Sequence, residues 1–163
     1  MFDSMTGNQI FIVEKVALDG LRAVAFSPNG KYFAVTPDSS LDVYLRVYHA
    51  SNYTVYGKYT DPKGPYGDMR CVAFSADSDR VMAGGADRTL RQYSISKNAM
   101  VTRTSTTSGA WINGCDYSVD GKRIAFSEDS TSSVRVIDSS TGTDTLQPIQ
   151  IGYCPYAVAY RPT

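Results

Sequence analysis

Short apolar runs and polar turn phrases alternate along this chain, and the alternation repeats at a nearly constant period. A phrase of the type Val-Ala-Phe-Ser occurs four times, at 24–27, 72–75, 115–118 and 158–161. The aromatic third residue of this phrase recurs at intervals of 48, 43 and 43 residues. Self-similarity at a period of about 20–50 residues is the signature of a repeat architecture. The pattern therefore predicts repeated copies of one structural unit.

The sequence of each repeated unit predicts four short strands. Asn-Gly at 29–30 and Asp-Gly at 120–121 are hairpin signals, because both residue types tolerate the positive φ of a tight turn. We expect second strands at 32–35, 80–83 and 123–126, third strands at 43–48, 89–94 and 133–138, and weaker fourth strands at 54–59, 100–104 and 145–149. No stretch keeps a 3.6-residue apolar period, so almost no helix is expected.

The first strand of each unit is apolar on both faces, as in Leu21–Phe26. A strand is buried on both faces when its sheet lies between two neighbouring sheets. Four-stranded antiparallel units of this length that stack on one another are the blades of a β-propeller. The small residues Ala25, Ala73 and Ala159 lie where such blades crowd near the central axis. We therefore expect an all-β fold, a β-propeller or a partial propeller.

Three stretches resemble known propeller repeats. "MRCVAFSADSDRVMAGGADRTLRQYS" (69–94) resembles a WD40 repeat, and "SVRVIDSSTGTDTLQPIQIGYCPYAVAYRP" (133–162) is similar to the YVTN type of microbial surface propellers. "VAFSPNGKYFAVTPDSSLDVYLRVYHASNY" (24–53) resembles divergent repeats of tailed-bacteriophage structural proteins. The Trp-Asp pair of WD40 repeats is replaced by Tyr48-His49, Tyr93-Ser94 and Ile137-Asp138, and no Gly-His pair precedes an inner strand. This departure argues against a typical eukaryotic WD40 scaffold.

The repeat boundaries predict a single propeller-like domain over 1–163. "FDSMTG" at 2–7 matches "IDSSTG" at 137–142, so 1–20 is expected to hold the outer strand of an incomplete blade, near 10–15. Full blades are expected at 21–68, 69–111 and 112–154, and 155–163 is expected to be the inner strand of a next blade. Propellers typically have four to eight blades. We therefore expect packing against protein: a second copy, another propeller chain, or the rest of a longer polypeptide of which this is a fragment.

The composition argues against nucleic acid and membranes as partners. The chain carries 16 basic and 16 acidic residues, so it lacks the basic excess of a nucleic-acid-binding surface. No apolar run approaches the roughly 18–20 residues that cross a bilayer, so no membrane partner is expected. The start "MFDSMTGNQI" has no basic or apolar leader region. The sequence leaves the localisation open between a virion and the cytoplasm.

The three cysteines form no Cys-x-x-Cys motif, so neither a zinc site nor a disulfide framework is expected. Cys71 and Cys115 fall in adjacent inner strands. Stacked sheets lie about 10 Å apart, beyond the roughly 7 Å Cα separation that a disulfide spans. Free buried thiols are therefore expected, in keeping with a reducing compartment, and Cys154 in the last loop is a candidate reactive thiol.

The sequence predicts no catalytic, cofactor or metal site. His49 is the only histidine, and no nucleophile-elbow motif accompanies it. "AGGAD" at 83–87 lacks the Gly-Lys-Ser/Thr of a phosphate loop. Most aspartates fall at turns, where turn chemistry explains them. Asp116 is the exception, because it occupies an inner-strand position and is expected to face the central channel or to meet a partner.

The first blade is longer than the others in two loops, 36–42 and 59–68, which emerge on the same rim of a propeller. Seven of the twelve tyrosines fall in 32–66. Tyrosine is favoured in interfaces because it offers a large contact area at low rotamer entropy. The candidate partner-binding residues are Tyr59, Pro62, Lys63, Pro65, Tyr66, Asp38 and Asp42.

These features predict a non-catalytic structural and protein–protein interaction module of a larger assembly. The resemblance of the first unit implies a bacteriophage virion protein, in the tail, neck or capsid surface. A cellular adaptor of WD40 or YVTN type is the first alternative. A propeller lactonase or hydrolase is the second, and it requires several acidic or histidine side chains at the channel, where only Asp116 is expected.

Overall fold

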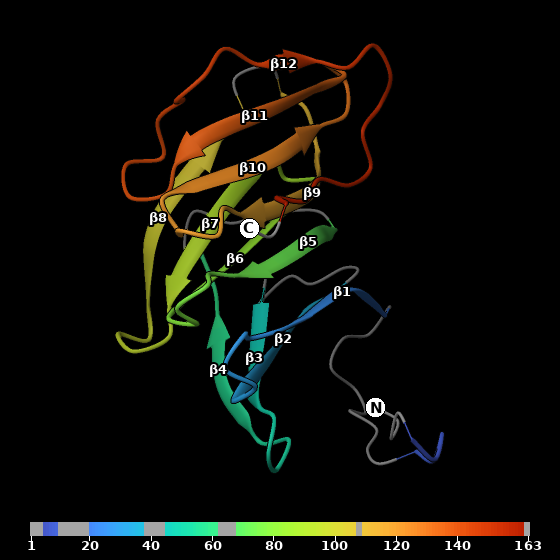
Figure 1. Cartoon of the computed structure of the whole chain (residues 1–163), viewed down its shortest axis with the longest axis vertical. Helices are drawn as coiled ribbons and strands as arrows, with labels where there is room; N and C mark the ends of the chain where they lie inside the picture. The colour runs from blue at the N-terminus through green and yellow to red at the C-terminus, as the bar shows by residue number, and fades with distance from the viewer. Residues whose placement is uncertain (1–4, 10–19, 38–44, 62–67, 107–108, 162–163) are drawn as a thin grey trace.

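The computed structural model describes residues 5–9, 20–37, 45–61, 68–106 and 109–161. These residues form twelve strands and no helix (Figure 1). Blade 1 contains β1 (Leu21–Phe26), β2 (Tyr32–Pro37), β3 (Leu45–His49) and β4 (Val55–Tyr59). Blade 2 contains β5 (Met69–Phe74), β6 (Arg80–Gly85), β7 (Thr89–Ser94) and β8 (Ala99–Ser105). Blade 3 contains β9 (Ile112–Tyr117), β10 (Arg123–Glu128), β11 (Ser133–Asp138) and β12 (Ile149–Gln150).

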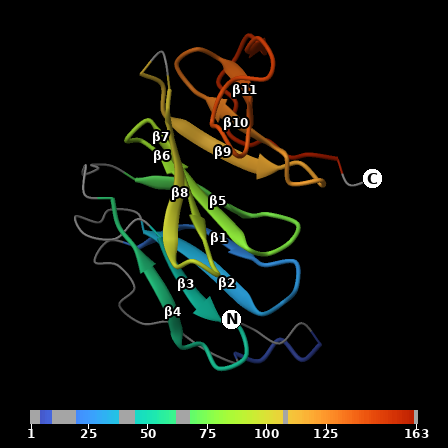
Figure 2. The same cartoon turned by 90° about the vertical axis from the view of Figure 1, so that its left-hand side faces the viewer.

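Each blade is a four-stranded antiparallel meander in which the first strand lies at one edge and the fourth at the other. The three sheets stack on one another, and β1, β5 and β9 lie side by side (Figure 2). This is the arrangement of consecutive propeller blades around an axis. The all-β partial propeller expected from the repeat pattern is confirmed.

The hairpins between the first and second strands share one turn chemistry. In each, a serine hydroxyl accepts the N–H of the first residue of the second strand and donates to an Asn or Asp side chain two residues further on. The three sets are Ser27–Asn29–Tyr32, Ser75–Asp77–Arg80 and Ser118–Asp120–Arg123. The following residue has positive φ in all three turns, 68° at Gly30, 63° at Ser78 and 68° at Gly121.

The core lies between the blades. One buried apolar cluster joins blades 1 and 2 and includes Leu45, Val47, Met69 and Tyr93. A second cluster joins blades 2 and 3 and includes Met82, Ile112 and Phe126. Because each sheet contributes one face to its neighbour, the stacking of blades, rather than any single sheet, buries the apolar side chains.

The strand β1 departs from the expectation that first strands are buried on both faces. Val24 and Phe26 are 63% and 53% exposed, whereas Phe74 and Tyr117, which correspond to Phe26 in the repeat, are 8% and 5% exposed. β5 and β9 each lie between two segments of chain, but β1 has a described blade on one side only. The same apolar pattern is therefore buried in blades 2 and 3 and exposed in blade 1.

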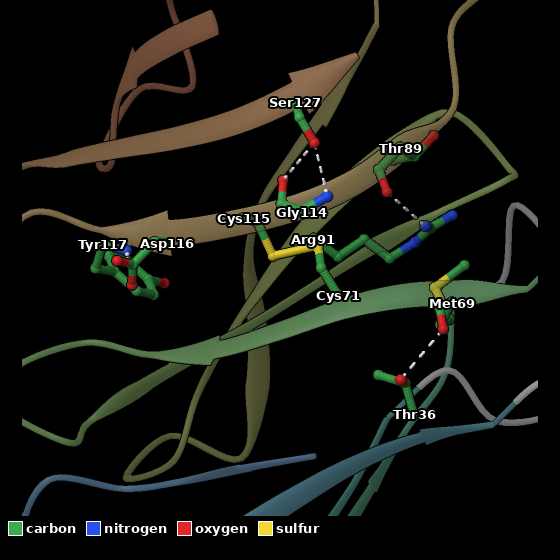
Figure 3. Close-up of a disulfide and its surroundings, with 10 residues drawn as sticks. All are labelled: Thr36, Met69, Cys71, Thr89, Arg91, Gly114, Cys115, Asp116, Tyr117 and Ser127. Carbon is green, nitrogen blue, oxygen red and sulfur yellow. Dashed lines mark hydrogen bonds between the residues drawn. A yellow bond between two sulfur atoms is a disulfide. The ribbon is translucent and has the colours of Figure 1, made fainter. Parts of the chain in front are cut away.

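The expected free thiols of Cys71 and Cys115 are a wrong prediction. The two residues form a disulfide between β5 and β9, with their Cα atoms 5.8 Å apart (Figure 3). The spacing of about 10 Å applies to sheets packed face to face. Inner strands of neighbouring blades converge toward the axis, so their backbones approach more closely. Gly84, where an added Cβ would lie 2.9 Å from Ile112 and 3.3 Å from the Cys71 sulfur, leaves room for this approach.

The last blade also differs from expectation. The fourth strand expected at 145–149 is reduced to β12, with a separate bridge between Ile137 and Asp144. Pro148 has no N–H to give to a ladder, which accounts for the interruption. Residues 155–161 form no strand, but they run against β9, and a Cβ added at Gly114 would lie 2.7 Å from the Ala157 Cα. The outer strand expected near 10–15 lies outside the described residues.

Candidate interaction surface

The outer side of β1 carries several exposed apolar side chains. Leu21, Val24 and Phe26 are 47%, 63% and 53% exposed. The ring of Phe26 lies 5.7 Å from that of Phe33, which is buried in a small cluster with Val35 and Tyr48. Apolar side chains gathered on one strand edge are typical of a surface that binds protein.

A second surface forms where the inner strands begin. Asp68 accepts an ion pair from Arg22 at 3.3 Å and lies 3.8 Å from Arg70. The Arg70 guanidinium lies 4.3 Å from the centre of the Trp111 ring and donates to the Asn113 side-chain oxygen at 2.8 Å. Trp111 is 41% exposed. The N-terminal ends of the inner strands β1, β5 and β9 thus carry guanidinium and indole groups. Such groups are well suited to contacts with protein.

Tyr59, one of the candidate partner-binding residues, lies in the core and not on the surface. It is 4% exposed, and its ring centre lies 4.6 Å from that of Tyr93 in blade 2. Burial raises the pKa of the Tyr59 hydroxyl to about 12. Tyr59 therefore belongs to the core between blades 1 and 2, because the fourth strand of blade 1 turns this side chain toward its neighbour. The other six candidates, Pro62, Lys63, Pro65, Tyr66, Asp38 and Asp42, lie outside the described residues.

Asp116 contacts the chain's own C-terminal segment. Its Oδ2 accepts the backbone N–H of Tyr160 at 2.7 Å, and its Oδ1 accepts that of Tyr117 at 2.9 Å. The sequence predicts a channel-facing or partner-bound carboxylate at this inner-strand position. In the structure the carboxylate is used to hold residues 155–161 against β9, so its charge has hydrogen-bond donors within this chain.

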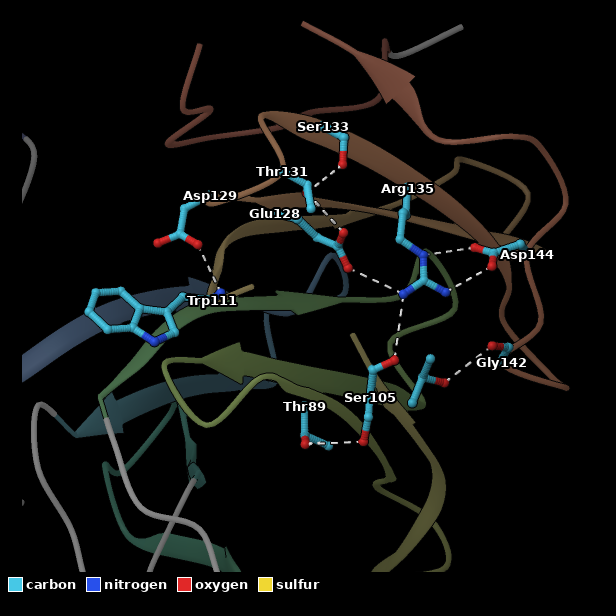
Figure 4. Close-up of polar contacts among 11 residues, drawn as sticks. Thr89, Ser105, Trp111, Glu128, Asp129, Thr131, Ser133, Arg135, Gly142 and Asp144 are labelled. Carbon is cyan, nitrogen blue, oxygen red and sulfur yellow. Dashed lines mark hydrogen bonds and ion pairs between the residues drawn. The ribbon is translucent and has the colours of Figure 1, made fainter. Parts of the chain in front are cut away.

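Buried ion pairs on the third strands are the main feature that the sequence analysis missed. Arg91 on β7 is fully buried and binds Asp61 of blade 1 at 2.9 Å and Asp87 at 2.6 Å. Arg135 on β11 binds Glu128 at 3.2 Å and Asp144 at 2.9 Å (Figure 4). The signal was present, because Leu-Arg or Val-Arg recurs at 45–46, 90–91 and 134–135. A buried charge requires such partners.

The remaining reactive side chains are accounted for by packing. The ring of His49 lies 5.5 Å from Tyr32 and 5.3 Å from Tyr56, within an aromatic group at the end of β3. Cys154 is a free, partly buried thiol whose sulfur accepts a 3.7 Å contact from the Asn113 amide. Among the described residues no group of three or more His, Cys, Asp or Glu side chains is placed to hold a metal. The same residues contain no helix that is long and apolar enough to span a membrane.

Comparison with known proteins agrees with this architecture. The family model "WD domain, G-beta repeat" matches residues 58–94, which include β5 to β7. The solved structure of the WD40 repeats of RRP9 superposes with a TM-score of 0.76 at 10% identity, over 88% of this chain and 42% of that one. Hydrazine synthase of Kuenenia stuttgartiensis superposes with a TM-score of 0.73 at 18% identity, over 90% and 41%. The chain thus spans about two fifths of the length of the structures it matches.

Proposed function

Since this chain is a partial β-propeller of WD40-like repeats, we propose that it is a non-catalytic structural module that joins a larger protein assembly through the exposed side of blade 1. The observation that carries this proposal is the exposure of Val24 and Phe26. The corresponding residues of blades 2 and 3 are covered by a neighbouring blade. The repeat therefore indicates that the face of a further blade would fit against Val24 and Phe26. Stacking of one blade on another buries apolar area, which is the usual driving force for association.

Within this proposal, a bacteriophage virion protein is the more specific form. It is supported by the resemblance of 24–53 to repeats of phage structural proteins. A cellular adaptor is the alternative, and it is favoured by the WD40 match at 58–94. The buried ion pairs around Arg91 and Arg135 belong to the packing of the blades, and the described residues offer no group of three or more His, Cys, Asp or Glu side chains placed to hold a metal.

A photo-crosslinking amino acid at position 26 tests the proposal. Placed there in the native source, it is expected to give one discrete product with a protein partner, identified by mass spectrometry. A structural protein of a virion would support the phage form, and a host protein would support the adaptor. The matched control is position 119, since Val119 is 49% exposed but lies in a hairpin turn of blade 3. Equal products from both positions, or no product from position 26, would contradict the proposal.

A further inference from the structure

The face of blade 2 that packs on blade 1 carries a pair of like charges. One cross-strand row on this face runs Val72–Ala83–Arg91–Arg103. Like charges directly opposite each other in neighbouring strands are destabilising. Asp61 of blade 1 removes this conflict, because its Oδ2 lies 2.9 Å from the Nε atoms of both Arg91 and Arg103. A carboxylate that follows the outer strand of one blade thus neutralises the cation pair of the next blade.

Blade 1 repeats this row on its own outward face. The corresponding positions are Val24–Val35–Arg46–Lys58, so Arg46 lies directly opposite Lys58. No ion pair joins either cation to a carboxylate in the part of the chain that the structure describes. Asp42, four residues before Arg46, corresponds to Asp87, four before Arg91, and lies outside the described residues. In blade 2 the cation pair binds Asp61 in addition to Asp87, and no carboxylate among the described residues takes the place of Asp61 at the blade 1 row.

Blade 3 differs from blade 2 in the source of the carboxylates that bind its third-strand arginine. Its third-strand arginine, Arg135, receives Glu128 and Asp144 from its own blade (Figure 4). The position in blade 2 that corresponds to Asp61 is Thr106, which carries no charge. Arg135, which has two carboxylates from its own blade, takes none from blade 2. The Arg91–Arg103 pair, which has Asp87 from its own blade, takes Asp61 from blade 1 as well. The donor and acceptor blades are matched in charge at both internal junctions.

We infer that the outward face of blade 1 binds a partner blade whose outer strand is followed by an Asp or Glu, which reaches Arg46 and Lys58 as Asp61 reaches Arg91 and Arg103. This inference rests on the proposed function and specifies the partner's chemistry. A second copy of this chain fits less well, because blade 3 carries Ile151 at the position that corresponds to Asp61. The occupant is therefore a blade other than the three described here, with an Asp or Glu at the end of its outer strand.

The full chain with one added blade provides a direct test. A second copy of residues 21–68, inserted between Gly20 and Leu21, places an additional Asp61 ahead of Arg46. Asp61→Asn in the added copy is expected to lower the thermal midpoint by about 2–4 °C. The same change should have no effect when Arg46→Met and Lys58→Met are present in the original blade 1, because the effect requires the cation pair. An equal effect in both backgrounds, or no effect in either, would overturn the inference.

A substitution in the unmodified chain keeps the inference testable if the added blade prevents folding. Lys58→Glu places a carboxylate opposite Arg46 and is expected to raise the thermal midpoint. Lys97→Glu, an exposed turn position, is the matched control and should leave the midpoint unchanged. An unchanged midpoint for Lys58→Glu would show that the pair needs no carboxylate.

Two further outcomes identify a different occupant and would also overturn the inference. One is a dimer in sedimentation velocity that dissociates on Arg46→Glu, which identifies a second copy. The other is a loss of stability on Glu14→Gln that disappears with Arg46→Met, which identifies the chain's own N-terminal segment. If these charge experiments fail but a discrete crosslink still forms at position 26, only this inference is overturned. If the crosslink at position 26 does not form, the proposed function is overturned.

Discussion

At the scale of single residues, the turns of this protein combine hydrogen-bonded side chains with a few backbone positions that suit glycine better than the residue present. Arg88 and Ser132 have φ values of 66° and 51°, in the left-handed region that disfavours side chains with a Cβ. Asp138 collects hydrogen bonds from the backbone and hydroxyl groups of Ser140 and Thr141. These local features have separate, measurable effects on stability.

Replacement of Ser132 by glycine is expected to stabilise the protein by about 1 kcal/mol. Glycine adopts a φ of 51° without steric cost, whereas serine pays for it with close contacts of its Cβ. Denaturant unfolding of Ser132→Gly measures the effect. Ser130→Gly, two residues earlier in the same turn and without positive φ, is the control and should be neutral or slightly destabilising. A loss of stability in Ser132→Gly would contradict the interpretation.

Asp138 is expected to contribute to stability at neutral pH and to lose that contribution in acid. The Ser140 hydroxyl, followed by the Thr141 and Ser140 N–H groups, lowers the pKa of Asp138 from 3.8 to about 2. The folded state therefore binds fewer protons than the unfolded state between these values, so stability falls as the pH falls from about 4 to about 2. The free energy of unfolding, measured across this pH range, should depend less steeply on pH in Asp138→Asn than in the unmodified protein. Ser140→Ala should reduce the slope in part. An identical slope in Asp138→Asn would contradict this assignment.

At the scale of elements, strands from different blades are joined by a disulfide and by ion pairs as well as by apolar packing. The Cys71–Cys115 bond links β5 to β9, and Asp61 links the end of blade 1 to β7 and β8. The Tyr117 hydroxyl donates to Gln92 at 2.8 Å, which ties β9 to β7. Burial raises the pKa of Tyr117, so it remains protonated and able to donate. Each junction between blades thus has specific polar contacts in addition to its apolar cluster.

Reduction of the Cys71–Cys115 disulfide is expected to lower the free energy of unfolding by about 4 kcal/mol, as a loop of 44 residues is no longer closed in the unfolded chain. Cys71→Ala with Cys115→Ala should give the same loss, and a reducing agent should then have no further effect. Cys154→Ser is the control, because this thiol lies outside the disulfide. A midpoint that does not respond to reduction would show that the bond does not constrain the unfolded chain.

At the scale of the whole molecule, the three blades differ in how completely they are covered. Blade 2 lies between two other sheets, and every residue of β7 is buried. Blade 3 is covered on its second side by residues 155–161, where Val158 and Tyr160 pack on Ala125 and Val134. In blade 1 the strand β1 stays exposed along its outer side. Stability is therefore expected to fall from the centre of the stack to its blade 1 end.

Amide hydrogen exchange should follow this order. The amides of β6 and β7 are expected to exchange most slowly, because their opening requires separation of buried sheets, and those of β1 and β12 most quickly. Mass spectrometry of exchanged peptides measures the difference. If β1 were as protected as β5, the outer side of blade 1 would be covered in solution, contrary to the arrangement described for residues 20–37.

The strands and hairpins could be predicted from the sequence because they depend on neighbouring residues. Apolar alternation located β5 to β7 and β9 to β11 closely, and the Ser-x-Asn/Asp phrases specify hairpin turns through contacts that span five residues. The tertiary structure alone decided how far apart the inner strands lie, and hence that Cys71 meets Cys115. It likewise decided that Tyr59 points toward blade 2 and that Asp61 meets Arg91. The physical reason is that these contacts depend on the angle and spacing between whole blades, which no local pattern along the chain encodes.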